Sequence, residues 1–231
     1  MKNIIKITLI SSALIFCIFS SIFCNKLKSD TKPDEGVITY EITYLDSERE
    51  NPIIALLPKE MIVKFKDNKT ATIIEGFMGF FEMTFVTDKN KSFTLLKIMG
   101  NKYYSEIDSN SLNFGYEKMQ GLTVKKINET KLISGFKCNR AQIVCDSISS
   151  EPFNVYYTND ISIKNPNAAS PYSGIEGVLM NFKVNLNNIN MSMNATKVVS
   201  EDIDDAVFSI PQEYKKVDKS EMIKLITGFS K

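Results

Sequence analysis

Apolar and polar residues alternate along most of the chain from Gly36 onward. In residues 37–44 the even positions carry isoleucine or tyrosine, whereas Thr39, Glu41 and Thr43 occupy odd positions. A period of two is the period of a β-strand whose two faces lie in different surroundings. This segment therefore predicts a strand with one buried face.

The same alternation returns in ten further short segments, separated by residues that favour turns. These segments are 60–66, 70–75, 80–86, 92–99, 102–107, 123–130, 136–146, 153–158, 178–186 and a strand that begins at residue 189. Turn signals stand at 67–69, 100–101 and 187–188. Short connections of this kind join antiparallel neighbours, because parallel strands need a long crossover.

Helical spacing is rare in this chain. Met222, Ile223 and Ile226 recur at that spacing within residues 219–229, which predicts a short C-terminal helix, and residues 52–57 are interpreted as a short apolar turn. The expected fold class is mainly β with few helices, built on a curved antiparallel sheet of about ten or eleven strands. A curved sheet of that size must close, split or wrap around something.

The first residues are typical of an export signal. Lys2 and Lys6 precede the apolar run 7–23, and the chain turns polar directly after Cys24. A charged segment followed by an apolar segment is the pattern of a secretory signal. Counted from Ile4, the apolar run also reaches about 20 residues, the length that spans a bilayer. An uncleaved anchor and a soluble secreted form therefore stay open as alternatives.

Cys24 stands where a bacterial lipoprotein signal carries the cysteine that is lipidated after cleavage, although Phe23 is larger than the small residue usual before a cleavage site. We expect a signal peptide over 1–23, a lipidated tether over 24–35 and a single domain over 36–231. Acyl chains on Cys24 would hold the protein on a membrane. The expected localisation is the cell envelope, as an exported outer-membrane lipoprotein that faces the periplasm or the surface.

The chain contains no histidine, 28 basic residues and 27 acidic residues. Histidine is the usual general base near neutral pH and the commonest metal ligand, so its absence excludes Ser-His-Asp catalysis and most zinc sites. The balanced charges give no basic surface for nucleic acid. We expect no catalytic residue, no cofactor, no metal site and no nucleic-acid partner, and an enzyme built on carboxylates, lysine or tyrosine is the least favoured class.

Cys138 and Cys145 are the two cysteines of the expected domain. Their spacing along one extended strand is roughly 23 Å, which is too far for a disulfide. A bridge requires a turn between them, two buried free thiols are the favoured interpretation, and a metal site is the least favoured. The acidic run at residues 201–205 is interpreted as a solvated turn rather than as paired catalytic carboxylates.

Phenylalanine and methionine are unusually frequent, with 15 Phe and 10 Met, and they crowd on one face of two predicted hairpins. Aromatic rings and unbranched thioethers adapt to irregular apolar ligands, although they also fill ordinary cores. We expect a cavity of roughly 300 Å³ or more for a hydrophobic ligand. Its candidate lining residues are Phe81, Met83, Phe85, Met180, Phe182, Met191 and Met193.

Four segments, in their order, resemble the landmarks of an uncharacterised family of bacterial envelope proteins. They are KINETKLISGFKC at 126–138, VYYTNDI at 155–161, SGIEGVLMNF at 173–182 and FSIPQEY at 208–214. The resemblance covers about residues 36–217. The layout is also similar to that of the outer-membrane lipoprotein carriers, whose fold is an unclosed antiparallel half-barrel with a few short helices that lid an apolar concavity. Soluble carriers lack a membrane anchor, whereas Cys24 suggests one here.

The resemblance implies a half-barrel that binds a lipid or a lipidated partner without chemistry. The leading hypothesis is therefore a non-enzymatic envelope lipoprotein that binds a lipid or other hydrophobic ligand in the concave face of the half-barrel. The alternative is a structural or protein-interaction module of the cell envelope that takes no small ligand. Such a module would contact another envelope protein through an exposed edge strand or through loops.

Overall fold

The computed structural model describes residues 32–46, 57–76, 79, 81–88, 92–107, 115–186 and 188–228. The chain from Pro33 onward forms one compact unit, to which the fold described below belongs. The expected signal peptide and Cys24 lie outside the described residues, so the signal, the lipidated tether and the domain boundary at residue 36 stay predictions. Within the described part of the chain, no helix has the length and apolar character needed to cross a bilayer.

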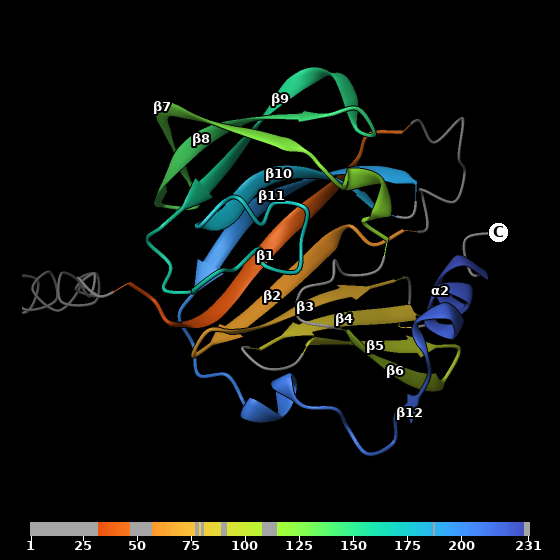
Figure 1. Cartoon of the computed structure of the whole chain (residues 1–231). Coiled ribbons are helices and arrows are strands. Elements are labelled where there is room, and N and C mark those ends of the chain that lie inside the picture. Colours follow the sequence, from red (N-terminus) through yellow and green to blue (C-terminus); the bar gives the residue numbers. More distant parts are fainter. Residues whose placement is uncertain are drawn as a thin grey trace, which may run out of the picture. The chain divides into compact units, whose positions relative to one another are not determined.

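A single curved, unclosed sheet of 12 strands dominates the described residues (Figure 1). The strand order is β12-β6-β5-β4-β3-β2-β1-β11-β10-β9-β8-β7. The strands are β1 (Glu35–Tyr44), β2 (Glu60–Lys66), β3 (Lys69–Glu75), β4 (Phe81–Thr87), β5 (Ser92–Ile98), β6 (Asn101–Ile107), β7 (Thr123–Ile133), β8 (Phe136–Cys145), β9 (Ser149–Thr158), β10 (Val178–Leu186), β11 (Ile189–Val199) and β12 (Lys215–Lys216). The described helical elements are η3 (Glu117–Met119), η4 (Asp205–Phe208) and α2 (Lys219–Gly228).

The alternation seen in the sequence decides which face each strand buries. Ile38 of β1 pairs with Val63 of β2, and Val63 pairs with Thr72 of β3, so these three side chains share one face. We call this face of the sheet the inner face. Ala71 and Val86 pair across β3 and β4 on the opposite face, which we call the outer face.

Tight turns set the register of the hairpins. Asp67 and Asn68 both have positive φ, at 50° and 67°, and so do Met99 at 48° and Gly100 at 81°. Two successive residues with positive φ form the mirror-image turn whose twist matches that of the flanking strands. The hairpin expected at 67–69 is confirmed. The next turn falls at Met99 and Gly100, one residue before the predicted position, because Ile98 already pairs with Asn101.

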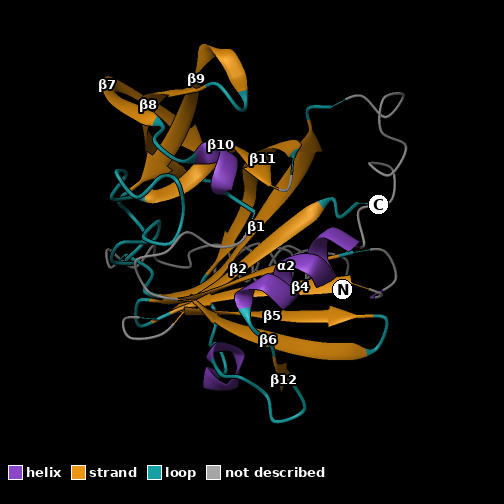
Figure 2. Ribbon diagram, turned by 45° about the vertical axis from the view of Figure 1, so that its right-hand side comes forward, coloured by secondary structure: helices purple, strands orange, loops and turns teal. Residues whose placement is uncertain are grey.

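The inner face is covered by the chain itself. Tyr172 and Ile175, from the segment between β9 and β10, are 1% exposed and belong to the same core cluster as Ile38 and Tyr40. We call this segment, residues 159–177, the inner loop. At the other end of the sheet α2 lies beside β4, β5 and β6 (Figure 2). Its Met222 is completely buried.

The outer face is covered at the same end of the sheet. Ala71, Val86 and Phe93 form a buried cluster against which Phe208 and Ile210 pack. These two residues belong to the segment after β11 that contains η4. The strands β3 to β6 are therefore covered on both faces, which explains the continuous burial of β5, where residues 92–96 are all buried.

The expected class, a mainly β protein with a curved unclosed sheet, is confirmed. Eleven of the strands correspond to the eleven predicted segments, and the predicted C-terminal helix is α2. The additional strand, β12, has two residues and runs parallel to β6, so the sheet is mixed. A strand of two residues is too short to show an alternating pattern, so the sequence could not predict β12. The inner loop covers much of the inner face, where the sequence predicted a few short lid helices.

Candidate functional site

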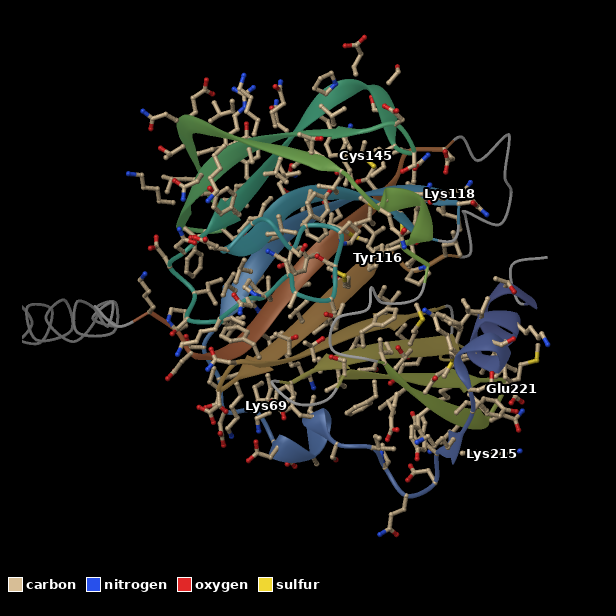
Figure 3. All side chains as sticks on the ribbon, viewed as in Figure 1. Lys69, Tyr116, Lys118, Cys145, Lys215 and Glu221 are labelled. Atoms are coloured by element: carbon tan, nitrogen blue, oxygen red, sulfur yellow. The ribbon has the colours of Figure 1, made fainter. Side chains whose placement is uncertain are left out.

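A cavity of about 120 Å³ lies between the inner face of the sheet and the inner loop. The strands β1 to β4, β10 and β11 supply one side of it, and Pro166, Asn167 and Ser170 of the inner loop supply the other. Tyr116, which precedes η3 and is labelled in Figure 3, also lines the cavity. The cavity is partly open to solvent.

One wall of the cavity is aromatic. Phe182 of β10 makes edge-to-face contacts with Tyr40 and Tyr172, with ring centroids 5.8 Å and 6.0 Å apart. The Tyr40 hydroxyl donates to the carbonyl oxygen of Leu179 at 2.8 Å, and the Tyr172 hydroxyl donates to the carbonyl oxygen of Lys183. Both flanking rings are thus tied to the backbone of the strand that carries Phe182, and the wall is rigid.

The facing wall carries hydroxyl groups. Thr70 and Thr72 of β3 and Thr87 of β4 line the cavity around Phe85, which pairs with Thr72. No described residue forms a hydrogen bond with the hydroxyl of any of these three threonines. On β5, directly opposite Phe85, Thr94 is completely buried and its hydroxyl also has no partner among the described residues. This part of the inner face therefore has hydrogen-bonding capacity that the described chain does not use.

Internal hydrogen bonds hold the inner loop in place. The side-chain amide of Asn167 donates to the carbonyl oxygens of Ile175 at 2.6 Å and Gly177 at 2.9 Å, and the Ser170 hydroxyl donates to the carbonyl oxygen of Asn167 at 3.0 Å. A Cβ atom at Gly177 would lie 2.6 Å from the carbonyl oxygen of Thr158, so only glycine fits where the loop meets β10. The roof of the cavity is preformed.

The described lining of the cavity is uncharged near neutral pH. Burial raises the pKa of Tyr116 to about 12, and it raises the pKa of Tyr40 and of Tyr172 above the usual range of a phenol. The other described lining residues are aliphatic, aromatic, hydroxyl or amide side chains. Such a set can bind a neutral ligand through van der Waals contacts and hydrogen bonds.

The candidate lining residues divide into two groups. Phe85, Phe182 and Met193 do line the cavity. The others pack in the core: Met180 and Met191 in the main cluster, and Phe81 and Met83 in the cluster beneath α2. Met180 is completely buried, which is the role of methionine as a filler of irregular cores.

Cys138 and Cys145 are buried free thiols, so the favoured interpretation of the two cysteines is confirmed. Cys145, labelled in Figure 3, lies at the end of β8. Burial raises the pKa of the Cys138 thiol to about 11, which keeps it protonated and unreactive. In the described part of the chain no three potential ligands come together in a way that could hold a metal ion.

The acidic run at 201–205 forms the solvated turn that was expected. The Asp204 carboxylate accepts from the backbone N–H of Ala206 at 2.9 Å and caps η4. Asp205 forms an ion pair with Lys69, labelled in Figure 3, at 3.0 Å, while the side chain of Asp202 is 96% exposed. The carboxylates point to separate partners and do not form a catalytic pair.

The fold and the cavity define a curved β-sheet domain with a covered inner face and a small neutral cavity beneath its cover. Residues 38–219 match the family described as "N-glycanase peptide, N-terminal domain". The chain therefore belongs to this family. A search of curated proteins gave no match.

Two solved structures of PNGF-II, one in space group P21 and one in C2, are similar to this chain. Their TM-scores are 0.52 and 0.51, and their sequence identities are 16% and 18%. The similarity covers 84% and 85% of this chain and 33% of the PNGF-II chain in each case. This chain thus spans about a third of the length of PNGF-II, and at this identity the similarity shows the fold alone.

The family corrects the expectations that came from the resemblance. The chain does not belong to a family of outer-membrane lipoprotein carriers, and the expected lipid-binding lipoprotein function is wrong. The expectation of a protein outside enzyme families is also wrong, because the family is that of an N-glycanase domain. The alternative hypothesis, a structural or protein-interaction module, gains no clear support from the family. Export, the coarser part of the expected localisation, agrees with the family.

The structure supplies the physical reason for the correction. The inner loop fills the concavity that we expected a lipid to occupy. The cavity that remains beneath it, about 120 Å³, is smaller than the roughly 300 Å³ that a small-molecule pocket needs. The unused threonine hydroxyls would also be a poor surface for an acyl chain.

Several residues that line the cavity were not predicted from the sequence. Thr70, Thr72 and Ile74 are spaced by two residues, so the strand pattern of β3 already placed all three on one face. Their role became visible only with the register that brings them beside Phe85. Asn167 and the rest of the inner loop carry no periodic signal. Their position depends on contacts with distant strands.

Proposed function

We propose that this chain acts in the processing of N-linked glycans and that its inner-face cavity engages the glycan. The observation that carries the proposal is the family match over residues 38–219. PNGF-II supports it through the shared fold. Because this chain spans about a third of the length of PNGF-II, we assign the activity of a whole N-glycanase to it only as part of this proposal.

The chemistry of the cavity suits a sugar. A sugar ring presents C–H groups on one side and hydroxyl or amide groups on its edges, so a site for it needs an aromatic surface and hydrogen-bonding partners together. Phe182 supplies the first, and Thr70, Thr72 and Thr87 supply the second. The described lining of the cavity is neutral, as most glycan residues are.

The partner in this proposal is a glycoprotein met outside the cytoplasm. The near equality of 28 basic and 27 acidic residues supports a partner that is not a polyanion such as nucleic acid. A protein of the cell envelope is a further partner that the proposal allows. It would meet the chain through the edge strand β7 or through loops.

The proposal is tested by binding of a fluorescent N-glycopeptide, compared with the same peptide that carries no glycan. Fluorescence anisotropy should show that the glycopeptide binds at least about tenfold more tightly, a difference of about 1.4 kcal/mol. Mass spectrometry of the glycopeptide after incubation tests whether the chain also releases the glycan. Equal affinity for the two peptides, without any release, would refute a role in glycan processing.

A further inference from the structure

The size of the cavity restricts which part of a glycan can enter it. A volume of about 120 Å³ is well below the roughly 300 Å³ at which pockets for whole small-molecule ligands begin. This is room for a short substituent of a sugar rather than for the whole ring. We propose that the cavity takes the acetamido group of an N-acetylhexosamine residue, an inference that rests on the function proposed above.

The aromatic wall provides the contact for the methyl group of the acetamido substituent. Phe182 is partly exposed at the cavity, and Tyr40 and Tyr172 hold its ring edge to face. Both tyrosine hydroxyls are engaged by backbone carbonyl oxygens, so these residues present carbon rather than oxygen. A methyl group placed here gains dispersion contacts and leaves no polar partner unpaired.

The hydroxyl wall provides the partners for the amide. An acetamido group has one N–H donor and one carbonyl acceptor, and a threonine hydroxyl can donate and accept. The hydroxyls of Thr70, Thr72 and Thr87 have no partner among the described residues. These three groups lie on adjacent strands across the cavity from the inner loop, and Thr70 pairs directly with Thr87.

Other ligand chemistries fit less well. An acyl chain would leave the three hydroxyls without partners, which costs free energy in a partly buried site. A phosphate or carboxylate would need a cation, and the described lining residues include no lysine or arginine. A simple sugar hydroxyl would use the threonines and leave the aromatic wall uncovered. An acetamido group satisfies both walls at once.

The experiment compares two disaccharides that differ in this group. N,N′-diacetylchitobiose carries acetamido groups where cellobiose carries hydroxyls, and both are neutral. Titration of the full chain, followed by amide NMR shifts, should show that diacetylchitobiose binds about tenfold or more tightly than cellobiose. Saturation-transfer signals should be strongest at the acetamido methyl protons.

Thr72→Val and Thr87→Val remove one hydroxyl each and keep the branched shape of the side chain. Each should weaken binding of diacetylchitobiose about 3- to 10-fold, the loss expected for one hydrogen bond. Thr43→Val is the matched control, since Thr43 is exposed on β1 away from the cavity. Thermal unfolding should show all three variants close to the wild type, because none loses a hydrogen bond within the described chain.

The outcomes separate this inference from the proposed function. Equal binding of the two disaccharides, or unchanged binding in both cavity variants, overturns the acetamido site while glycopeptide binding leaves the function standing. If neither disaccharide nor the N-glycopeptide binds, the inference and the proposed function fail together. Acetamido-selective binding that both cavity variants weaken and Thr43→Val preserves supports the site.

Discussion

Single polar atoms decide how rigid the cavity is. The hydroxyls of Tyr40 and Tyr172 each reach a backbone carbonyl of β10, and the amide of Asn167 reaches two carbonyls at the end of the inner loop. A buried carbonyl oxygen that loses its donor keeps its desolvation penalty. The cavity walls are therefore sensitive to changes that remove one atom.

Tyr172→Phe tests this sensitivity. The variant keeps the ring beside Phe182 and leaves the carbonyl oxygen of Lys183 without its donor, so we expect a loss of about 1–2 kcal/mol in the free energy of unfolding. Urea unfolding followed by circular dichroism measures it. Tyr156→Phe is the control: the Tyr156 hydroxyl has no partner among the described residues, and its ring stays near Lys131. A similar loss in both variants would contradict the assigned role of the Tyr172 hydroxyl.

The sequence predicted some residues of the cavity but not the contacts between them. The alternation in β1 placed Tyr40 on the buried face, and the hairpin pattern placed Phe85 and Phe182 on inner faces, where the structure has them. The partner of the Tyr40 hydroxyl lies 139 residues away in the chain. No local pattern connects two such residues, because they meet only once β1, β11 and β10 have paired.

At the scale of elements, the first residue of β1 holds the segment that follows β11. The Glu35 carboxylate accepts from the backbone N–H of Ile203 at 2.6 Å and from Lys66 at 3.1 Å, and Lys66 also donates to the carbonyl oxygen of Ile203. The backbone N–H of Ile203, followed by Lys66, lowers the pKa of Glu35 from its ordinary value of 4.5. These contacts connect the strand to the outer cover of the sheet.

This connection predicts a dependence of stability on pH. A carboxyl whose pKa is lowered by folding stabilises the protein above its unfolded pKa, and that contribution is lost as the pH falls through the lowered value. The wild type should therefore unfold at a higher temperature than Glu35→Gln at pH 7, and the difference should shrink as the pH falls below the ordinary value of 4.5 and vanish once Glu35 is protonated in the folded state. Glu41→Gln, an exposed change on the same strand, is the control. A difference that stays constant or grows on acidification would rule out the Glu35 contact as its cause.

At the scale of the whole folded unit, the sheet is stabilised by covers on its two faces. The inner loop and α2 cover the inner face, and the segment around η4 covers the outer face of β3 to β6. These covers leave the cavity of about 120 Å³ as the space beneath the inner loop. The curved sheet thus encloses its own chain, and a small neutral site remains where a large apolar one was expected.

Met222→Ala tests the contribution of the α2 cover. Met222 is completely buried against Met83 and Leu96, so its truncation should lower the free energy of unfolding by about 2–5 kcal/mol. Lys224→Ala lies on the exposed side of the same helix and should change stability by less than about 0.5 kcal/mol. Urea unfolding of both variants measures the difference. Equal stability of the two variants would show that α2 does not pack on the sheet.

The sequence by itself determined eleven of the twelve described strands, the hairpin turn at 67–69, the C-terminal helix and the buried faces, because these follow from local periodicity and from residues that accept positive φ. Only the tertiary structure decided that residues 159–177 fill the inner face, that Thr70, Thr72 and Thr87 meet the wall of Phe182, and that the remaining cavity is small. Those outcomes depend on the curvature of the sheet and on contacts between residues far apart in the chain. A two-residue periodicity shows which face is buried, and the fold determines what that face meets.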